Sequence, residues 1–371
     1  MIDTVLRKVA TVLRYLFPSA RERAYLRVIA REGGFDRAFY LRAHPGLHPL
    51  FRLMPARHYI QHGEAKGLSP NGRFSPRAYL YHNPDLDPDS TRPLLHYLQT
   101  GRDEARTALL EHGSVPLPDL PPAPAPAADP APVAVVVHLY YLDMWDEFAE
   151  TLANQHFAFD LWVTLNDDGS GAAAALRARI LDRFTRARVH LLPNHGRDIF
   201  PFVWLASGGA LSAYAAVCKL HSKKSPHRDD GDDWRRDLTR GVLGDPVRTA
   251  ARLERFLAHP RAGFWVAPGQ RFEGDAHWGV NLDRARALLA ARERALPDAP
   301  LVFPAGSIYW ARRAVVQSLA GLDLGAADFE PEQALVDGTT AHAIERLMGS
   351  LAQALDREVL TTDDLDAQTE V

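Results

Sequence analysis

Two short polar segments in the middle of the chain contain residue types that bind phosphate. Asn194-His195-Gly196-Arg197-Asp198 follows the apolar run 189–192, and His221-Ser222-Lys223-Lys224 follows the apolar run 215–220. Arg binds phosphate oxygens through paired N–H groups and Lys binds them as a point charge. The pattern therefore predicts an anionic ligand, most simply a diphosphate. The alternative for the Lys pair is a solvated turn.

Strands and helices in alternation must position these segments. The predicted strands are 133–139, 159–165, 189–192, 215–220 and 263–267, and the predicted helices include 144–153, 172–186, 199–211, 234–243, 246–257 and 282–296. The alternation predicts an α/β fold with a Rossmann-type, mostly parallel sheet flanked by helices. Ligands of such sheets bind at the carboxyl ends of strands. We therefore expect the two polar segments to follow adjacent strands and to face one ligand.

Segments further along the chain supply candidate carboxylates and sugar contacts. Asp328 to Glu332 and Asp337 precede a predicted amphipathic helix that carries His342, Glu345 and Arg346. The apolar run 301–310 is broken by Gly306-Ser307 and ends at Trp310, and Gly in such a run often marks close approach of backbone to a ligand. The alternatives are structural. Asp337 could be a helix N-cap, the helix residues could brace one another, and Trp310 and Trp278 could fill the core.

Composition excludes several classes of protein. The 371 residues are enough for two or three domains, and a net charge of -3 gives no argument for nucleic-acid binding. A single cysteine, Cys218, excludes an internal disulfide and fits a reducing cytoplasm, and we interpret it as a core residue. No secretory signal or membrane span is predicted. The dinucleotide motif G-x-G-x-x-G does not follow the first strand.

The N-terminal third has a different organisation. Residues 1–31 predict a basic amphipathic helix, which could lie on a membrane or pack on its own protein. Residues 32–112 predict an all-α module of two repeats, because the pattern around Phe35 and His58 recurs around Phe74 and His96. We interpret its Tyr and His positions as packing residues, since no metal spacing accompanies them.

The remaining segments predict irregular structure. Residues 113–132 are rich in Pro and Ala and predict an extended linker. The acidic run 229–233 lacks the spacing of a calcium loop and predicts a mobile surface loop. Residues 361–371 are expected to form a tail.

Four motifs, in this order, resemble the rhamnan synthesis protein F family. They are 194–202, 221–225, 303–310 and 337–346, and the likeness spans roughly residues 133–350. The family is tied to assembly of bacterial rhamnose-containing polysaccharides and O-antigens. The resemblance implies a rhamnosyltransferase that takes a nucleotide-sugar donor such as dTDP-L-rhamnose and a polysaccharide or lipid-linked glycan acceptor. The N-terminal repeats resemble modules beside bacterial glycosyltransferase domains, which implies docking of other glycosyltransferases.

The motif order also resembles a GT-A glycosyltransferase domain, here residues 133–360. In that fold an Asp-x-Asp motif holds a divalent cation beside the leaving diphosphate, and His221-Ser222-Lys223 stands at that position here. A Lys pair can supply the positive charge directly. We therefore predict chemistry with no obligatory metal, and the role of a divalent cation stays open.

The resemblance assigns roles to the candidate residues. The donor diphosphate would be held by Asn194, Gly196, Arg197, Asp198, His221, Lys223 and Lys224, with Asp198 orienting Arg197. The acceptor would be held by Gly306, Ser307, Trp310, His342 and Arg346. The general base would be Asp337, with Glu332 and Asp328 as further candidates, in an inverting single displacement.

Two other functions stay open. The missing Asp-x-Asp motif motivates an inactive, transferase-like scaffold in polysaccharide assembly. A phosphotransferase is the second alternative, although no Gly-rich phosphate loop appears. In each case the expected location is the cytoplasm, and contact of residues 1–31 with the inner face of the membrane is one of the two alternatives for that helix.

Overall fold

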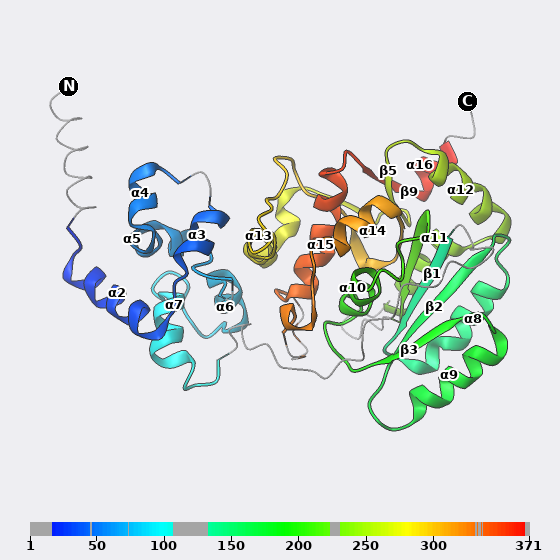
Figure 1. Ribbon diagram of the computed structural model, residues 1–371, viewed down its shortest axis with the longest axis horizontal. Helices are drawn as coiled ribbons and strands as arrows, with labels where there is room; N and C mark the ends of the chain where they lie inside the picture. Colours follow the sequence, from blue (N-terminus) through cyan, green and yellow to red (C-terminus); the bar gives the residue numbers. More distant parts are fainter. Residues whose placement is uncertain are drawn as a thin grey trace. The chain divides into compact units, whose positions relative to one another are not determined.

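The computed structural model describes residues 17–44, 47–72, 74–106, 133–222, 231–330, 332, 335 and 337–367, with the backbone alone at 231–235. The chain divides into two compact units (Figure 1). The first contains residues 1–111 and 280–295, and the second contains residues 112–279 and 296–371. The predicted linker 113–132 and the pair Lys223 and Lys224 lie outside the described residues.

A seven-stranded sheet forms the centre of the second unit. Its order is β3 (Arg188–Leu192), β2 (Phe159–Asn166), β1 (Val133–Leu139), β4 (Ala216–His221), β8 (Tyr309–Arg312), β5 (Ala262–Val266) and β9 (Glu358–Thr361). The first four strands are parallel to one another and β9 is parallel to β5, whereas β8 is antiparallel to both of its neighbours. Strands β6 (Arg271–Glu273) and β7 (Val302–Pro304) form a small antiparallel sheet. The predicted mostly parallel α/β fold is confirmed.

Helices cover both faces of this sheet. One face packs against α8 (Trp145–Ala153), α9 (Ala172–Arg183), α11 (Gly231–Leu243), α12 (Pro246–Ala258) and α16 (Thr362–Ala367). The other face packs against α10 (Ile199–Ser207), α14 (Arg313–Ala320) and α15 (Thr340–Gln353), and Figure 1 shows α10 opposite α8 and α9. Every residue of β1 is buried, which explains why its sequence is apolar without alternation.

The strand order corrects one expectation. Strands β3 and β4 follow each other in sequence but are not neighbours, because β2 and β1 lie between them. The chain runs outward from β1 through β2 to β3 and then returns to the other side of β1 with β4. Such a reversal creates a crevice at the carboxyl ends of β1 and β4, where open α/β sheets bind ligands.

The C-terminal residues correct a second expectation. Residues 361–367 are part of the domain and not a tail, because Thr361 ends strand β9 and helix α16 follows it. Leu365 is fully buried in the core, and the Thr362 hydroxyl donates a hydrogen bond to the Gly241 carbonyl. Residues 368–371 lie outside the described residues.

The first unit is built from two helical repeats. The first repeat contains α3 (Arg37–Ala43), α4 (Pro49–Leu53), α5 (Pro55–His58) and the π-helix η1 (Tyr59–Gly63), followed by η2 (Glu64–Lys66). The second contains α6 (Pro76–His82), α7 (Pro93–His96) and the π-helix η3 (Tyr97–Gly101). Each repeat joins its two parts by the same hydrogen bond, Tyr40 to His58 in one and Tyr79 to His96 in the other, both 2.8 Å.

Helix α13 (Leu282–Ala290) belongs to the first unit, although we predicted it within the domain 133–360. Its Ala287 and Ala290 pack against Phe39, and the Arg284 guanidinium donates to the Gly72 carbonyl at 2.8 Å. No local pattern could predict this placement, because the contacts join residues that lie more than 200 positions apart.

Helix α2 (Ala20–Glu32) packs on the repeats of its own unit. Tyr25 and Ile29 are buried in the core of the repeats and are therefore not available to enter a lipid layer. Residues 1–16 lie outside the described residues. In the part of the chain that the structure describes, every helix is too short or too polar to cross a membrane.

Candidate functional site

The carboxyl ends of β1 and β4 are joined by polar backbone contacts. The Ser222 amide donates to the His138 carbonyl at 2.9 Å, and the Tyr141 amide donates to the Ser222 hydroxyl at 2.9 Å. His138 and His221 occupy paired positions on the two strands. Burial lowers the pKa of His138 to about 4, so this histidine is neutral at physiological pH. The segment 221–222 is therefore fixed against β1 at the predicted ligand edge.

A buried lysine connects this edge to the turn after β3. Lys219 of β4 is 1% exposed, and its ammonium group donates to Asp198 Oδ2 at 2.6 Å and to the Ser307 carbonyl at 3.0 Å. We predicted that Asp198 orients Arg197. Instead, Asp198 pairs with Lys219, and the Arg197 guanidinium contacts other residues.

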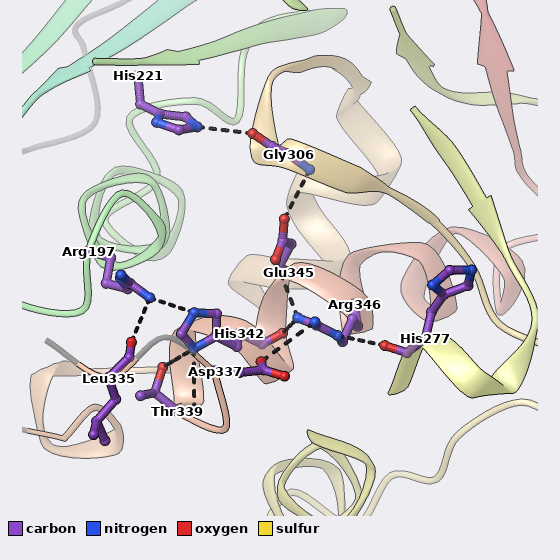
Figure 2. Close-up of polar contacts among 10 residues, drawn as sticks. All are labelled: Arg197, His221, His277, Gly306, Leu335, Asp337, Thr339, His342, Glu345 and Arg346. Atoms are coloured by element: carbon purple, nitrogen blue, oxygen red, sulfur yellow. Dashed lines mark hydrogen bonds and ion pairs between the residues drawn. The ribbon is translucent and has the colours of Figure 1, made fainter. Parts of the chain in front are cut away.

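The backbone at Gly306 is held from two sides (Figure 2). The His221 Nε2 contacts the Gly306 carbonyl at 3.0 Å, and the Gly306 amide donates to Glu345 Oε1 at 3.1 Å. Gly306 and Ser307 lie in the short 3-10 helix η6 (Ala305–Ser307) between β7 and β8. The predicted Gly-Ser break therefore lies beside β4, and it interacts with His221.

Arg197 reaches from the turn after β3 to the start of α15. Its Nη1 donates to the Leu335 carbonyl at 3.1 Å and to His342 Nε2 (Figure 2). On its other side, the His342 Nδ1 lies 2.8 Å from the Thr339 hydroxyl and accepts a hydrogen bond from the Thr339 amide at 3.4 Å, which completes the capping box of α15. Gly196 precedes Arg197 with φ 56°, and a Cβ there would overlap Phe200 and Phe329. The turn therefore requires glycine at this position.

Asp337 forms an ion pair and does not cap the following helix. Its Oδ1 lies 3.5 Å from Arg346 Nη2, whereas the N-cap of α15 is Thr339. Arg346 also donates to the carbonyls of His277 and His342, at 2.8 and 2.9 Å (Figure 2). The structure therefore excludes the capping alternative for Asp337, and its role as a base stays a prediction.

The other acidic candidates differ in their surroundings. Asp328 Oδ2 accepts a hydrogen bond from the Gly325 amide at 2.9 Å, which stabilises a local turn. Glu332 is exposed and lines a small pocket together with Arg197 and Thr339. Glu330, which we did not single out, is 6% exposed and accepts bonds from the Thr340 amide and hydroxyl, both 2.9 Å. Of the three predicted carboxylates, Glu332 lines a pocket with Arg197, and Asp337 pairs with Arg346, which also binds the His342 carbonyl.

Trp310 is wrongly predicted as a sugar contact. Its side chain is fully buried, its Nε1 donates to the Val242 carbonyl at 3.0 Å, and its ring stacks on Trp265 at 6.0 Å. It belongs to the core on the face of the sheet covered by α11 and α12. Trp278, at 5% exposure, is also buried, which agrees with the core-filling alternative for both. Asn194, in contrast, is exposed at the tip of its turn.

Lys219 is the functional candidate that the sequence analysis missed. The sequence contained an indication of its position. Residues two apart on a strand face the same side of the sheet, and Lys219 precedes the candidate His221 by two. Lys223 and Lys224 follow this strand in sequence but lie outside the described residues. Within the described residues, no group of three or more His, Cys, Asp or Glu side chains is arranged to hold a metal ion.

Comparison with known proteins gives a family and a few relatives. Residues 120–357 match the family described as rhamnan synthesis protein F. Proteins named "Uncharacterized protein WxcX" from two strains of Xanthomonas campestris pv. campestris are 34% identical over 215 residues. That match covers 58% of this chain and 30% of each relative, so the chain spans under a third of their length.

The chain is also similar, at low identity, to a solved structure. The mannosyltransferase PcManGT from Pyrobaculum calidifontis, in complex with GDP-Man and Mn2+, is 16% identical over 78% of both chains, with a TM-score of 0.31.

Proposed function

The chain belongs to the rhamnan synthesis protein F family, and from that premise we propose that it is a glycosyltransferase of bacterial cell-surface polysaccharide synthesis. The sugar would be L-rhamnose, donated by a nucleotide diphosphate such as dTDP-L-rhamnose. The acceptor would be a growing rhamnan or O-antigen chain, or a lipid-linked glycan at the inner face of the membrane. The sheet with its antiparallel strand β8 is compatible with a GT-A-like domain.

The observation that carries this proposal is the reversal of the sheet between β1 and β4. Polar residues gather at the carboxyl ends of these strands, where the fold class binds its ligands. Arg197 adds a cation nearby, and its Nε and Nη2 make no hydrogen bond to the described residues. These donors suit the oxygens of a diphosphate.

The proposed reaction needs two actions from the protein. Arg197, Lys223 and Lys224 would stabilise the negative charge that develops on the departing diphosphate. Asp337 would take the proton from the attacking acceptor hydroxyl as it bonds to the anomeric carbon. The bond from that carbon to the diphosphate oxygen breaks in the same step, so the anomeric centre is inverted. The lysines would supply the charge that a cation supplies elsewhere, so no metal would be obligatory.

Donor binding and turnover by the purified full chain test the proposal. We expect dTDP-L-rhamnose to raise the melting temperature more than GDP-mannose or UDP-glucose does, because a ligand stabilises the state that it binds. Turnover should persist in chelator. The double variant Lys223→Ala/Lys224→Ala should lose about 100-fold in kcat, the usual cost of removing electrostatic stabilisation. Lys66→Ala, in the first unit, is the matched control and should change neither property.

The second candidate function is an inactive scaffold, which is favoured by His221-Ser222-Lys223 at the position of the Asp-x-Asp motif. A scaffold would show no stabilisation by any of the three nucleotide sugars and no transfer with or without added Mn²⁺. Stabilisation by a donor without transfer would place the chain between the two candidates and exclude the proposed turnover.

A further inference from the structure

Six non-glycine residues of the described chain have a left-handed backbone, and four of them have an ordinary structural reason. These four follow the ends of helices, where a left-handed residue is common, and they are Ala105, Glu293, Asp323 and Asp356. The other two are Arg197, with φ 60°, and Ser307, with φ 57°. Both lie in turns of the candidate site. A residue in this conformation is unfavourable in isolation and persists only where its surroundings hold it in place.

Lys219 connects these two strained turns. Its ammonium group binds the carboxylate of Asp198, the neighbour of Arg197, at 2.6 Å, and the carbonyl of Ser307 itself at 3.0 Å. The rings of Phe202 and Tyr309 flank the same nitrogen at 6.0 and 5.8 Å from their centroids. An ammonium group this deeply buried is costly unless it is paired, so both of its partners are strongly constrained.

The turn at Ser307 is also held by one side chain of β4 and one of α15. His221, two residues after Lys219 on β4, contacts the Gly306 carbonyl, and Glu345 of α15 accepts from the Gly306 amide. Three polar side chains therefore hold two consecutive residues of this turn. Lys219 also holds the turn after β3 through its 2.6 Å bond to Asp198, and His221 Nε2 lies 3.7 Å from the same carboxylate oxygen.

We propose that Lys219 is a positioning residue that holds the turn 194–198 and the turn 305–307 in register at the ligand edge. The identity of the ligand that the two turns bind rests on the proposed function. The connection of the two turns through Lys219 does not depend on it. Lys219 has no direct contact with a ligand in this proposal. It fixes the positions of Arg197 and Ser307. Loss of the Lys219 ammonium group should therefore loosen both turns, although they lie far apart in the sequence.

Hydrogen exchange measured by mass spectrometry tests the connection without any assay of activity. In Lys219→Met, which keeps the length of the side chain, amides of peptides spanning 194–200 and 303–309 should exchange about tenfold faster or more. Arg252→Met is the matched control, because it breaks a bidentate ion pair with Asp366 on the opposite face of the sheet. It should accelerate neither peptide. Acceleration confined to 194–200 would overturn the proposal.

A double variant separates positioning from folding stability. Lys219→Met/Asp198→Asn removes both charges and should restore the melting temperature toward that of the wild type, since no unpaired charge is left buried. It should still show fast exchange in both peptides, and it serves as the test protein if Lys219→Met does not fold. Slow, wild-type exchange in both peptides of the double variant would show that Lys219 serves stability only.

Turnover distinguishes this inference from the proposed function. With dTDP-L-rhamnose, Lys219→Met and the double variant should each lose about tenfold or more in kcat, and Lys219→Arg should keep part of the rate. A double variant with wild-type kcat and KM would contradict the positioning role. A wild-type protein without turnover or donor binding would contradict the proposed function, while coupled exchange of the two turns would still support the role of Lys219.

Discussion

Each unit of this protein buries a charged side chain, and the two differ in what surrounds the charge. Glu64 in the repeats is 4% exposed and binds Arg92 at 2.6 Å, the Tyr25 hydroxyl at 2.7 Å and the Leu94 amide at 2.9 Å. Its partners lie in helices or at their starts. Lys219 in the sheet is 1% exposed, and both of its partners lie in turns with left-handed residues at the ligand edge.

The comparison shows that burial of a charge does not by itself indicate a functional site. Glu64 joins the first repeat to α2 and α7, and its hydrogen bonds involve no unusual backbone. Lys219 stabilises backbone conformations that are unfavourable in isolation. We therefore expect loss of Glu64 to affect stability alone, and loss of Lys219 to affect the geometry of the site.

The largest expected effect on stability comes from Glu64→Gln. If this variant altered the second unit as well as the first, the proposed contrast between Glu64 and Lys219 would be wrong. The variant leaves Arg92 without its carboxylate and should lower the free energy of unfolding of the first unit by about 3 kcal/mol. We take the lower end of the usual range because the Arg92 side chain is 34% exposed. Unit-resolved hydrogen exchange under denaturant should show the loss in residues 17–106 and 280–295, but not in the sheet.

The second repeat supplies the control for this experiment. Arg102 follows Gly101 as Glu64 follows Gly63, but its side chain is 44% exposed and pairs with Glu32 at the surface. Arg102→Met should cost less than about 1 kcal/mol. Equal losses in the two variants would mean that burial does not explain the importance of Glu64.

Asp283 of α13 is an intermediate case, because it is buried but incompletely paired. It is 2% exposed, lies 3.7 Å from Arg77 and 3.8 Å from Arg286, and its Oδ2 accepts no hydrogen bond from the described residues. Burial raises the pKa of Asp283 from 3.8 to about 6, and the two arginines only partly oppose this shift. At neutral pH the buried carboxylate is therefore a cost to the first unit.

The sign of the pH dependence follows from that shift. The protonated acid stabilises the folded unit fully below pH 4, and this stabilisation is lost as pH rises through 6. The unfolding free energy of the first unit should fall by up to about 3 kcal/mol over this interval, and Asp283→Asn should remove most of the fall. Urea unfolding at pH 4, 5, 6 and 7 measures it, with the exposed Asp103→Asn as control. An unchanged slope in Asp283→Asn would contradict the prediction.

The sequence predicted elements better than it predicted their neighbours. The run 133–139, which is apolar except for His138, is strand β1, and the helix predicted at 246–257 is α12 at Pro246–Ala258. Local patterns fix such elements because burial on one or both faces sets the period of apolar residues. The predicted adjacency of β3 and β4 was wrong, because strand order depends on where each crossover returns, and no local pattern records that.

The candidate site shows the same limit. Its turns were predicted from Asn194 to Asp198 and from Gly306 to Ser307, since turn residues and breaks in apolar runs are local features. Their connection through Lys219 was missed, because Ser307 lies 88 positions from Lys219. A lone Lys in an apolar run gives no indication of its partner.

The smallest expected effects on stability concern the glycines that end the two repeats. These variants test whether the first unit has a structural role only. A Cβ at Gly63 would overlap the Tyr40 hydroxyl, and a Cβ at Gly101 would overlap the Tyr79 hydroxyl. Each tyrosine would have to move away from its histidine partner. Gly63→Ala and Gly101→Ala should each cost about 1–3 kcal/mol through overpacking, measured by thermal unfolding.

Gly72→Ala is the matched control, because it adds the same methyl group within the same unit. A Cβ there would lie 3.7 Å from the Phe39 ring, an ordinary packing distance, so its cost should stay well below that of the other two variants. If the repeats serve stability alone, donor binding by the second unit should be the same in all three variants at temperatures where the first unit stays folded. A change in donor affinity in Gly63→Ala or Gly101→Ala, but not in Gly72→Ala, would show instead that the repeats influence the site. In that case Glu64 could no longer be assigned a role in stability alone, and its contrast with Lys219 would not hold.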